Sequence, residues 1–203
     1  MLEAQWLDVP EAKLLWCPGW LDQDEASLLA ARLQGGIEWR QDQMTLFGKT
    51  HPLPRLQAMY GDAGTRYDYS GMGLEALAWR PDLVELRTRL EADLHAFLPG
   101  VRFNSVLCNL YRDGRDSNGW HADDEAELGA DPVIASVSLG ATRRFRLRHR
   151  QGGAGPLTLD LPPGSLLVMA GSTQSAWQHT LTKTARPVGS RINLTYRLVQ
   201  PLL

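Results

Sequence analysis

The first hundred residues contain two segments that are predicted to form helices. Asp22-Gln-Asp-Glu25 has the form of an N-cap with a capping box, and it predicts a helix that runs to about Gln34. Pro81 suits the first turn of a second helix, which Pro99-Gly100 is expected to end. Apolar residues recur at helical spacing in this second segment, at Leu83, Leu86, Leu90, Leu94 and Phe97.

After Gly100 the pattern changes to short β-rich runs, separated by turn sequences such as Asp113-Gly114 and Pro162-Pro163-Gly164. Strands this short and this regular are typical of a sandwich or barrel. We therefore expect a mainly β protein with a double-stranded β-helix core (a jelly roll, cupin-like), with the helices packed on one sheet. The predicted strands cover residues 106–111, 133–139, 144–148, 157–161, 166–169 and 192–199. No linker divides the chain, so a single domain over residues 1–203 is expected.

A candidate metal site begins at Trp120-His121-Ala122-Asp123. On an extended segment, residues two apart point to the same side, so His121 and Asp123 can face one metal ion. With the distant His179 they would form the two-histidine, one-carboxylate arrangement of non-haem Fe(II) oxygenases, which leaves coordination positions open. The short motif alone is better explained by a histidine that caps a turn beside a solvated aspartate. His149 lies among arginines, and we expect it at the surface rather than on a metal.

The predicted strand near the C-terminus alternates strictly between polar and apolar residues. Ile192, Leu194, Tyr196 and Leu198 share one face, and Arg191, Asn193, Thr195 and Arg197 share the other. Guanidinium, amide and hydroxyl groups are those that a buried dicarboxylate would need, although a solvent-exposed basic face would give the same pattern. The Cα atoms of the two arginines are about 20 Å apart on an extended strand, so we expect one arginine to clamp the far carboxylate and the other to act nearer the metal.

Asn109 and Tyr111 share one face of another predicted strand with Leu107. Their amide and phenol groups could complete a dicarboxylate clamp. Ordinary half-buried strand residues would explain them as well.

Composition and charge add one indication of a partner. The chain has 203 residues, 43% of them hydrophobic, and a net charge of -2, which does not indicate a generic nucleic-acid binder. The charge is unevenly distributed, because residues 132–203 hold nine Lys and Arg but a single acid, Asp160. This asymmetry is compatible with a positive face for a polyanion, or with opposite charges that meet across the fold.

The two cysteines, Cys17 and Cys108, are far apart and do not suggest a disulfide framework. The sequence shows neither a secretory signal nor an apolar run long enough to span a bilayer. We therefore expect a soluble, cytoplasmic protein without a membrane partner, and a monomer.

Taken together, these segments resemble the AlkB family of Fe(II)- and 2-oxoglutarate-dependent dealkylating dioxygenases. The resemblance covers most of residues 104–199 and is carried by NLY (109–111), WHADDE (120–125), IASVSLG (134–140), WQH (177–179) and RINLTYR (191–197). Upstream, FGK (47–49), PR (54–55), Gln57 and YGDAG (60–64) look similar to the branch with mammalian nuclear homologues that repair DNA. The resemblance implies a jelly-roll catalytic core over residues 101–203, preceded by an N-terminal extension and nucleotide-recognition region over residues 1–100.

The resemblance also implies roles for individual residues. The iron ligands would be His121, Asp123 and His179, and the 2-oxoglutarate contacts would be Asn109, Tyr111, Arg191, Asn193 and Arg197. Tyr67 and Tyr69 match aromatic positions near the damaged base, and Asp124 and Glu125 match acidic positions close to it. An acidic group there would stabilise a base made cationic by alkylation, although the acidic pair is also compatible with a solvated turn.

Two further segments are candidates for contact with nucleic acid. Residues 44–49 are predicted to form a hairpin in which Phe47 either wedges between bases or folds back onto its own sheet, with Lys49 beside it. Arg144, Arg146 and Arg148 share one face of a predicted strand, where they would either contact phosphates or keep an edge strand soluble.

The function implied by the resemblance is direct-reversal DNA repair, in which Fe(II), 2-oxoglutarate and O2 oxidise the alkyl group of an N-alkylated base and an aldehyde is released. The target atom lies inside the base stack, so the base must be flipped out or come from a single strand. Two alternatives stay open at this stage. One is an oxygenase of the same type that acts on RNA, protein or a small molecule, and the other is an inactive nucleic-acid-binding module.

Overall fold

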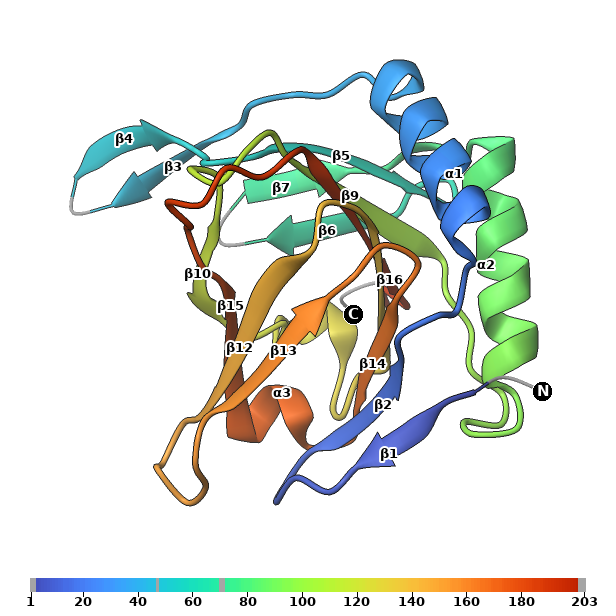
Figure 1. Ribbon diagram of the computed structural model, residues 1–203, viewed down its shortest axis with the longest axis vertical. Helices are drawn as coiled ribbons and strands as arrows, with labels where there is room; N and C mark the ends of the chain where they lie inside the picture. The colour runs from blue at the N-terminus through green and yellow to red at the C-terminus, as the bar shows by residue number, and fades with distance from the viewer. Residues whose placement is uncertain (1–2, 47, 70–71, 201–203) are drawn as a thin grey trace.

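The computed structural model describes residues 3–46, 48–69 and 72–200, and two β-sheets dominate it (Figure 1). The larger sheet has eight strands in the order β1-β2-β14-β11-β16-β9-β5-β8, and the smaller has four in the order β10-β15-β12-β13. In the larger sheet the strands are β1 (Gln5–Leu7), β2 (Lys13–Cys17), β5 (Leu56–Gly61), β8 (Leu77–Ala78), β9 (Ser105–Tyr111), β11 (Ile134–Gly140), β14 (Leu166–Ala170) and β16 (Arg191–Arg197). In the smaller sheet they are β10 (Asn118–His121), β12 (Arg143–His149), β13 (Leu157–Leu161) and β15 (Trp177–Leu181). This two-sheet arrangement agrees with the predicted jelly roll.

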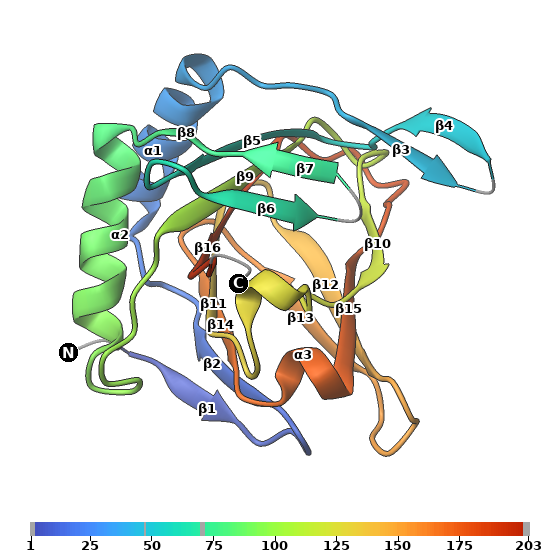
Figure 2. The same ribbon diagram turned by 180° about the vertical axis from the view of Figure 1, so that it is seen from behind.

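Two helices, α1 (Gln23–Gly36) and α2 (Pro81–Leu94), cover the face of the larger sheet that is turned away from the smaller one (Figures 1 and 2). Their apolar residues share one buried cluster with strand residues such as Val106, Leu194 and Tyr196. The predicted helix starts are confirmed, since the Asp22 carboxylate accepts the Glu25 N–H at 2.8 Å and Pro81 opens α2. Because the helices cover the apolar face of β16, its polar face is turned toward the second sheet.

Each of the six strands predicted after residue 100 is present, with ends that differ by at most two residues. The strands that the sequence did not reveal lack the alternating signal. The buried β5 is nearly apolar throughout, and the short β10 and β15 interleave polar and aromatic residues. The first hundred residues contribute four strands, β1, β2, β5 and β8, to the larger sheet.

Two hairpins and two short helical segments complete the described structure. The predicted hairpin is present, formed by β3 (Gln43–Leu46) and β4 (Lys49–Pro52), and the predicted wedge residue Phe47 lies outside the described residues. A second hairpin joins β6 (Arg66–Tyr69) to β7 (Met72–Glu75). A 3-10 turn spans Ala126–Leu128 and the short α3 spans Thr173–Ala176. In the described part of the chain, no helix is both long and apolar enough to cross a membrane.

Candidate metal and cosubstrate site

His121 and His179 meet because β10 and β15 pair antiparallel, with these two residues opposite each other in the register. Their ring centroids are 4.2 Å apart. Asp123, two residues after His121, completes the group, and one possible ligand atom from each of the three residues lies within 4.8 Å of the others. Asp123 is only 1% exposed, so the solvated turn that the sequence left open is excluded.

The hydrogen bonds and burial of the two imidazoles suit metal ligands. The Nδ1 atom of His121 lies 2.8 Å from the Gly119 carbonyl oxygen, which can only accept, so Nδ1 donates and Nε2 is the atom with a lone pair. Burial lowers the pKa of His179 to about 3, and burial also lowers that of His121. Both rings are therefore neutral at pH 7, which is the form that binds a metal.

The carboxylate of Asp123 is held at one oxygen and open at the other. Arg197 donates to Oδ2 from Nη2 at 2.6 Å and from Nε at 3.2 Å, while the Asp123 N–H donates to Gln174. Burial acts to raise the pKa of Asp123, but the Arg197 guanidinium outweighs it and holds the pKa well below its usual range. Oδ1 is buried, has no hydrogen-bond partner among the described residues, and lies 3.7 Å from His121 Nε2. An orphaned, ionised oxygen beside two neutral imidazoles fits a divalent cation.

Next to this cluster, a pocket lies between the two sheets and is partly open to solvent. Arg191 lies in its wall, 2% exposed, and donates from Nη2 to the Ser138 hydroxyl at 2.9 Å. Its guanidinium lies 5.3 Å from the centre of the Tyr111 ring, and its buried Nε has no acceptor among the described residues. Burial lowers the pKa of Arg191 to about 10, so the group is still a cation at pH 7. A desolvated cation with a spare donor fits a carboxylate of 2-oxoglutarate.

All five predicted cosubstrate residues line this pocket, namely Asn109, Tyr111, Arg191, Asn193 and Arg197. The exposed basic face that their strand pattern also allowed is therefore wrong. The side-chain amide of Asn193 donates to the Ser136 hydroxyl at 2.8 Å and to the Val137 carbonyl at 3.1 Å, which fixes it against β11. Arg197 already pairs with Asp123, so of the two arginines Arg191 is the one whose guanidinium has no carboxylate partner among the described residues.

Three residues that hold side chains of the pocket in place were missed by the sequence reasoning. Arg55 is buried and donates from Nε to the Asn109 side-chain oxygen at 2.9 Å. Ser136 and Ser138 hold Asn193 and Arg191 from β11. The two serines are two residues apart on one strand, so the sequence indicated that they share a face. No such pattern pointed to Arg55.

The residues predicted to contact a base lie in different environments in the structure. Tyr67 is buried beside the metal cluster, donates from its hydroxyl to Glu125 at 2.7 Å, and has the Arg197 guanidinium 5.1 Å from its ring centre. Burial raises the pKa of Glu125. Asp124 is instead exposed and paired with Arg150. The side chain of Tyr69 lies outside the described part of the structure.

The predicted phosphate-contacting arginines lie on the outer face of β12, where Arg144, Arg146 and Arg148 are exposed. Lys49 is exposed at the start of β4. The expectation that His149 is a surface residue is wrong. Its side chain is 4% exposed, because it packs edge-on against Trp177 and its Nε2 lies 2.9 Å from a carboxylate oxygen of Glu11.

Comparisons with known proteins agree with this architecture. Residues 13–197 match the family described as the 2OG-Fe(II) oxygenase superfamily. The chain is 40% identical over 193 residues to alpha-ketoglutarate-dependent dioxygenase alkB homolog 3 of Rattus norvegicus, covering 91% of this chain and 63% of that one. It is 42% identical over 187 residues to DNA oxidative demethylase ALKBH2 of Mus musculus, covering 87% of this chain and 76% of that one.

A solved structure, that of OsALKBH1, confirms the fold. It matches with a TM-score of 0.67 and 18% identity, and the match covers 95% of this chain and 100% of that one. The chain spans less than two thirds of the length of the alkB homolog 3 relative. The family match and the sequence identity show that this chain belongs to the AlkB family of the 2OG-Fe(II) oxygenase superfamily, whose cofactors are Fe(II), 2-oxoglutarate and O2.

Proposed function

We propose that this protein oxidatively dealkylates N-alkylated bases in DNA, with RNA as the second candidate substrate. The observation that carries the proposal is the orphaned Asp123 oxygen beside two neutral histidines, next to a pocket in which the buried Arg191 guanidinium has an Nε without an acceptor among the described residues. The relative of Mus musculus that is named a DNA oxidative demethylase supports DNA as the substrate. As part of the same proposal, the chain acts as a single-domain monomer in the cytoplasm.

In this proposal His121, Asp123 and His179 hold the iron. When bound, Fe(II) would activate O2 as the oxidant and 2-oxoglutarate would supply two electrons: one oxygen atom would enter succinate, with loss of CO2, and the other would go to the alkyl carbon. The hydroxylated alkyl group then leaves the base nitrogen as an aldehyde, and the nitrogen regains its proton or its lone pair.

The residues of this chain orient the reactants and exclude water. Arg191, with Tyr111 and Ser138 around it, binds the far carboxylate of 2-oxoglutarate. Arg197 keeps Asp123 ionised and leaves one of its oxygens for the metal. Arg191 and Arg197 are both buried, where the effective dielectric constant is lower than in water. Burial therefore strengthens the attraction of Arg191 for the carboxylate of 2-oxoglutarate and that of Arg197 for Asp123.

The base-side residues form the second half of the proposal. Tyr67 and Tyr69 are proposed to lie near a flipped base; Tyr67 is buried in this structure, with its hydroxyl on Glu125 and the Arg197 guanidinium on its ring. Of the two acidic residues, Glu125 is the better candidate for contact with a cationic base, because it is bonded to Tyr67, whereas Asp124 is paired with Arg150. Phe47, Lys49 and the outer arginines of β12 are proposed to contact the strand that carries the base.

The test is release of aldehyde from single-stranded oligonucleotides that carry one N-methylated base, measured together with succinate. We expect both products in equal amounts, and both should require Fe(II), 2-oxoglutarate and O2. An Asp123→Ala variant should form neither. Release of aldehyde from a protein or a small metabolite, but never from DNA or RNA, would contradict the proposal.

A further inference from the structure

Trp120 is an exposed aromatic residue at the edge of the site that the proposed mechanism does not use. It is 37% exposed and directly precedes His121 on β10. Neighbouring residues on a strand point to opposite faces of the sheet. His121 is turned inward to the metal cluster, so the Trp120 ring lies on the outside of the same strand.

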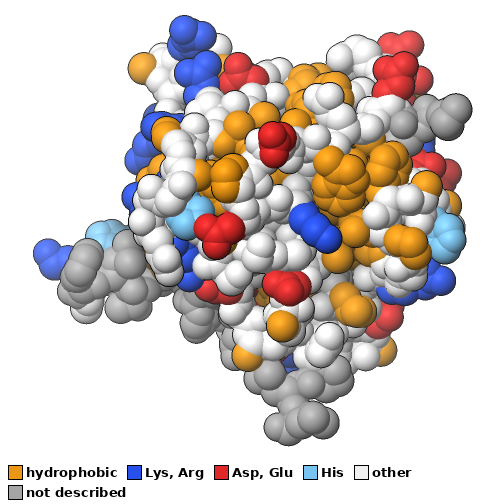
Figure 3. All heavy atoms as spheres, turned by 90° about the horizontal axis from the view of Figure 1, so that it is seen from below, with side chains coloured by type: hydrophobic (Ala, Val, Ile, Leu, Met, Phe, Trp, Pro, Cys, Tyr) orange, Lys and Arg blue, Asp and Glu red, His pale blue; other side chains and the backbone are white. Residues whose placement is uncertain are grey.

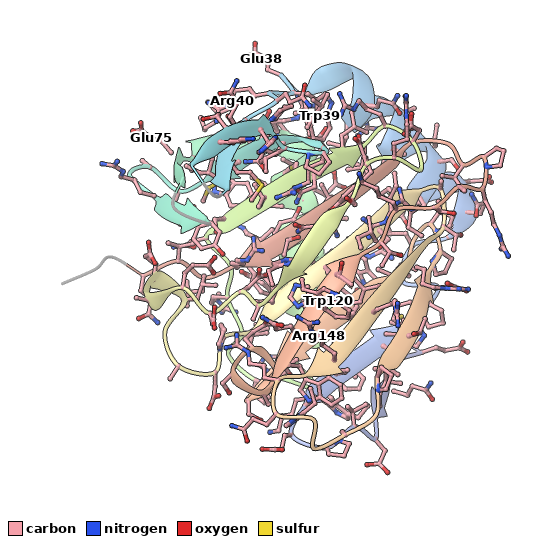
Figure 4. The ribbon with its side chains drawn as sticks, turned by 90° about the vertical axis from the view of Figure 1, so that its left-hand side faces the viewer. Glu38, Trp39, Arg40, Glu75, Trp120 and Arg148 are labelled. Atoms are coloured by element: carbon pink, nitrogen blue, oxygen red, sulfur yellow. The ribbon has the colours of Figure 1, made fainter. Side chains whose placement is uncertain are left out.

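The Trp120 ring is covered on one side by a guanidinium. The central carbon of the Arg148 guanidinium lies 4.3 Å from the ring centre, and Arg148 donates to the side-chain oxygen of Gln178 from Nη2 at 2.8 Å and from Nε at 3.2 Å. The three residues come from β10, β12 and β15, which are neighbours in the smaller sheet. Figure 4 shows Trp120 and Arg148 side by side on the face turned toward the viewer.

Arg148 and Arg146, on the outer face of β12, differ from the arginines on either side of them in the charge around them. Arg144 pairs with Asp160 and Arg150 pairs with Asp124, but within the described residues Arg148 has no carboxylate partner. Its charge is therefore not neutralised by the protein. A planar cation on an aromatic ring, held by a neutral amide, combines the two groups that bind unpaired bases and their phosphates.

The surroundings of Trp120 are suitable for a strand of nucleic acid. The β3–β4 hairpin and strands β10 and β15 lie on the same side of the molecule, the left in Figure 1 and the right in Figure 2. Seen from below in Figure 3, Lys and Arg side chains gather along that left-hand edge. A strand that presents one base to the pocket would pass over this positive surface.

We propose that Trp120 and Arg148 form a stacking platform for an unpaired base next to the target base. The platform would make the enzyme favour single-stranded over double-stranded nucleic acid. In a duplex the faces of a neighbouring base are already stacked, so only an unstacked base can use the indole or guanidinium plane. This inference rests on the proposed function, because it assumes that the target base enters the pocket beside His121.

The test measures binding under anaerobic conditions, with Fe(II) and 2-oxoglutarate present. The probes are a labelled single-stranded oligodeoxynucleotide with one N-methylated base, the matched duplex, and the methylated deoxynucleoside alone. Trp120→Ala should weaken single-strand binding roughly 5- to 100-fold, the range expected when one stacked base loses its platform. Binding of the duplex should stay within about twofold of wild type, and so should turnover of the deoxynucleoside, which is measured separately in the presence of O2.

Two controls separate stacking from a structural role. Trp120→Phe keeps an aromatic plane and should retain most of the single-strand affinity. Trp6→Ala removes another exposed tryptophan, 43% exposed on the edge strand β1, and should leave single-strand binding unchanged.

Three results would overturn the platform. The first is unchanged single-strand binding in Trp120→Ala. The second is an equal loss for single strand, duplex and deoxynucleoside, which would mean that the substitution disturbs His121. The third is a Trp120→Phe variant as weak as the alanine variant.

Failure of the proposed function gives a different result. In that case the wild-type protein would release no aldehyde from any methylated oligonucleotide. The proposed platform, which rests on that function, would then be rejected as well. If wild type is active and Trp120→Ala binds single strands equally well, the platform alone is wrong.

Discussion

Strands β16 and β12 both carry arginines on a polar face, yet these two faces lie in opposite environments. Arg191 and Arg197 of β16 are buried, whereas Arg144, Arg146 and Arg148 of β12 are exposed. Strand β16 lies in the middle of the larger sheet, and helices cover its apolar face. Its polar face must therefore turn inward. Alternation defines the two faces of a strand, but the layers around the strand decide which face is buried.

The two environments impose different requirements on the same side chain. A buried guanidinium needs an anion or other acceptors, and Arg197 has Asp123 while Arg191 has a spare donor in the cosubstrate pocket. An exposed guanidinium is solvated and requires no partner. Substitutions on the two strands should therefore affect different properties of the protein, and their effects should differ in size.

The largest difference is expected in stability. Arg197→Leu should lower the free energy of unfolding of the metal-free protein by about 3–5 kcal/mol, because Asp123 is left buried without its cation. Arg148→Leu should change it by no more than about 0.5 kcal/mol, as is usual at the surface. Denaturant unfolding of both variants measures this, and similar losses on both strands would contradict the comparison.

The next difference is expected in cosubstrate affinity. Arg191→Lys keeps the charge but loses the planar fork, and it should raise the KM for 2-oxoglutarate about 30-fold or more, equivalent to about 2 kcal/mol. Arg146→Lys, on the exposed strand, is the matched control and should leave this KM unchanged. A normal KM in Arg191→Lys would place the far carboxylate elsewhere.

A smaller effect is expected from pH. His179 has a pKa of about 3 in the folded protein and about 6.5 when unfolded, so the unfolded chain binds the extra proton first as pH falls. The titration of His179 alone should therefore cost the metal-free protein up to about 1.4 kcal/mol of stability per pH unit between about pH 6 and pH 4. Comparison of the unfolding curves of wild type and His179→Gln checks this. The account of His179 is wrong if the two proteins show the same dependence on pH.

The smallest effects are expected on the exposed strand. Changing Arg144, Arg146 and Arg148 together to glutamine should weaken oligonucleotide binding and flatten its salt dependence. The slope should fall by up to about 0.7 for each single-strand phosphate that is no longer neutralised by an arginine. The KM for 2-oxoglutarate should not change. An unaltered salt slope would show that these arginines do not bind phosphates.

Local features of the fold were predictable from the sequence, because their signals lie within a few residues. The Asp22 cap, the Pro81 helix start and the faces of residues 191–197 are all of this kind. Strands β10 and β15 were missed, although the metal ligands His121 and His179 lie on them. Their pairing register is set by the sheet topology, which no local pattern encodes.

The candidate site, too, could be predicted from the sequence only in part. The resemblance to a family pointed to the residues of the pocket, but the partner of each group follows from packing. Arg55 reaches Asn109 from a strand-flanking segment far away in the chain, and the buried position of His149 depends on Glu11 and Trp177. Neither contact could be predicted from the residue spacing or the composition of the sequence.

The central claim is that His121, Asp123 and His179 together bind one Fe(II). Equilibrium binding of Fe(II) under anaerobic conditions tests it most directly, in wild type and in single alanine variants of these three residues. His149→Ala is the control, since it removes another buried histidine that lies outside the cluster. The account predicts one tightly bound Fe(II) per chain in wild type and in His149→Ala, and loss of tight binding in each of the other three variants. Full Fe(II) binding in any of those three would contradict it.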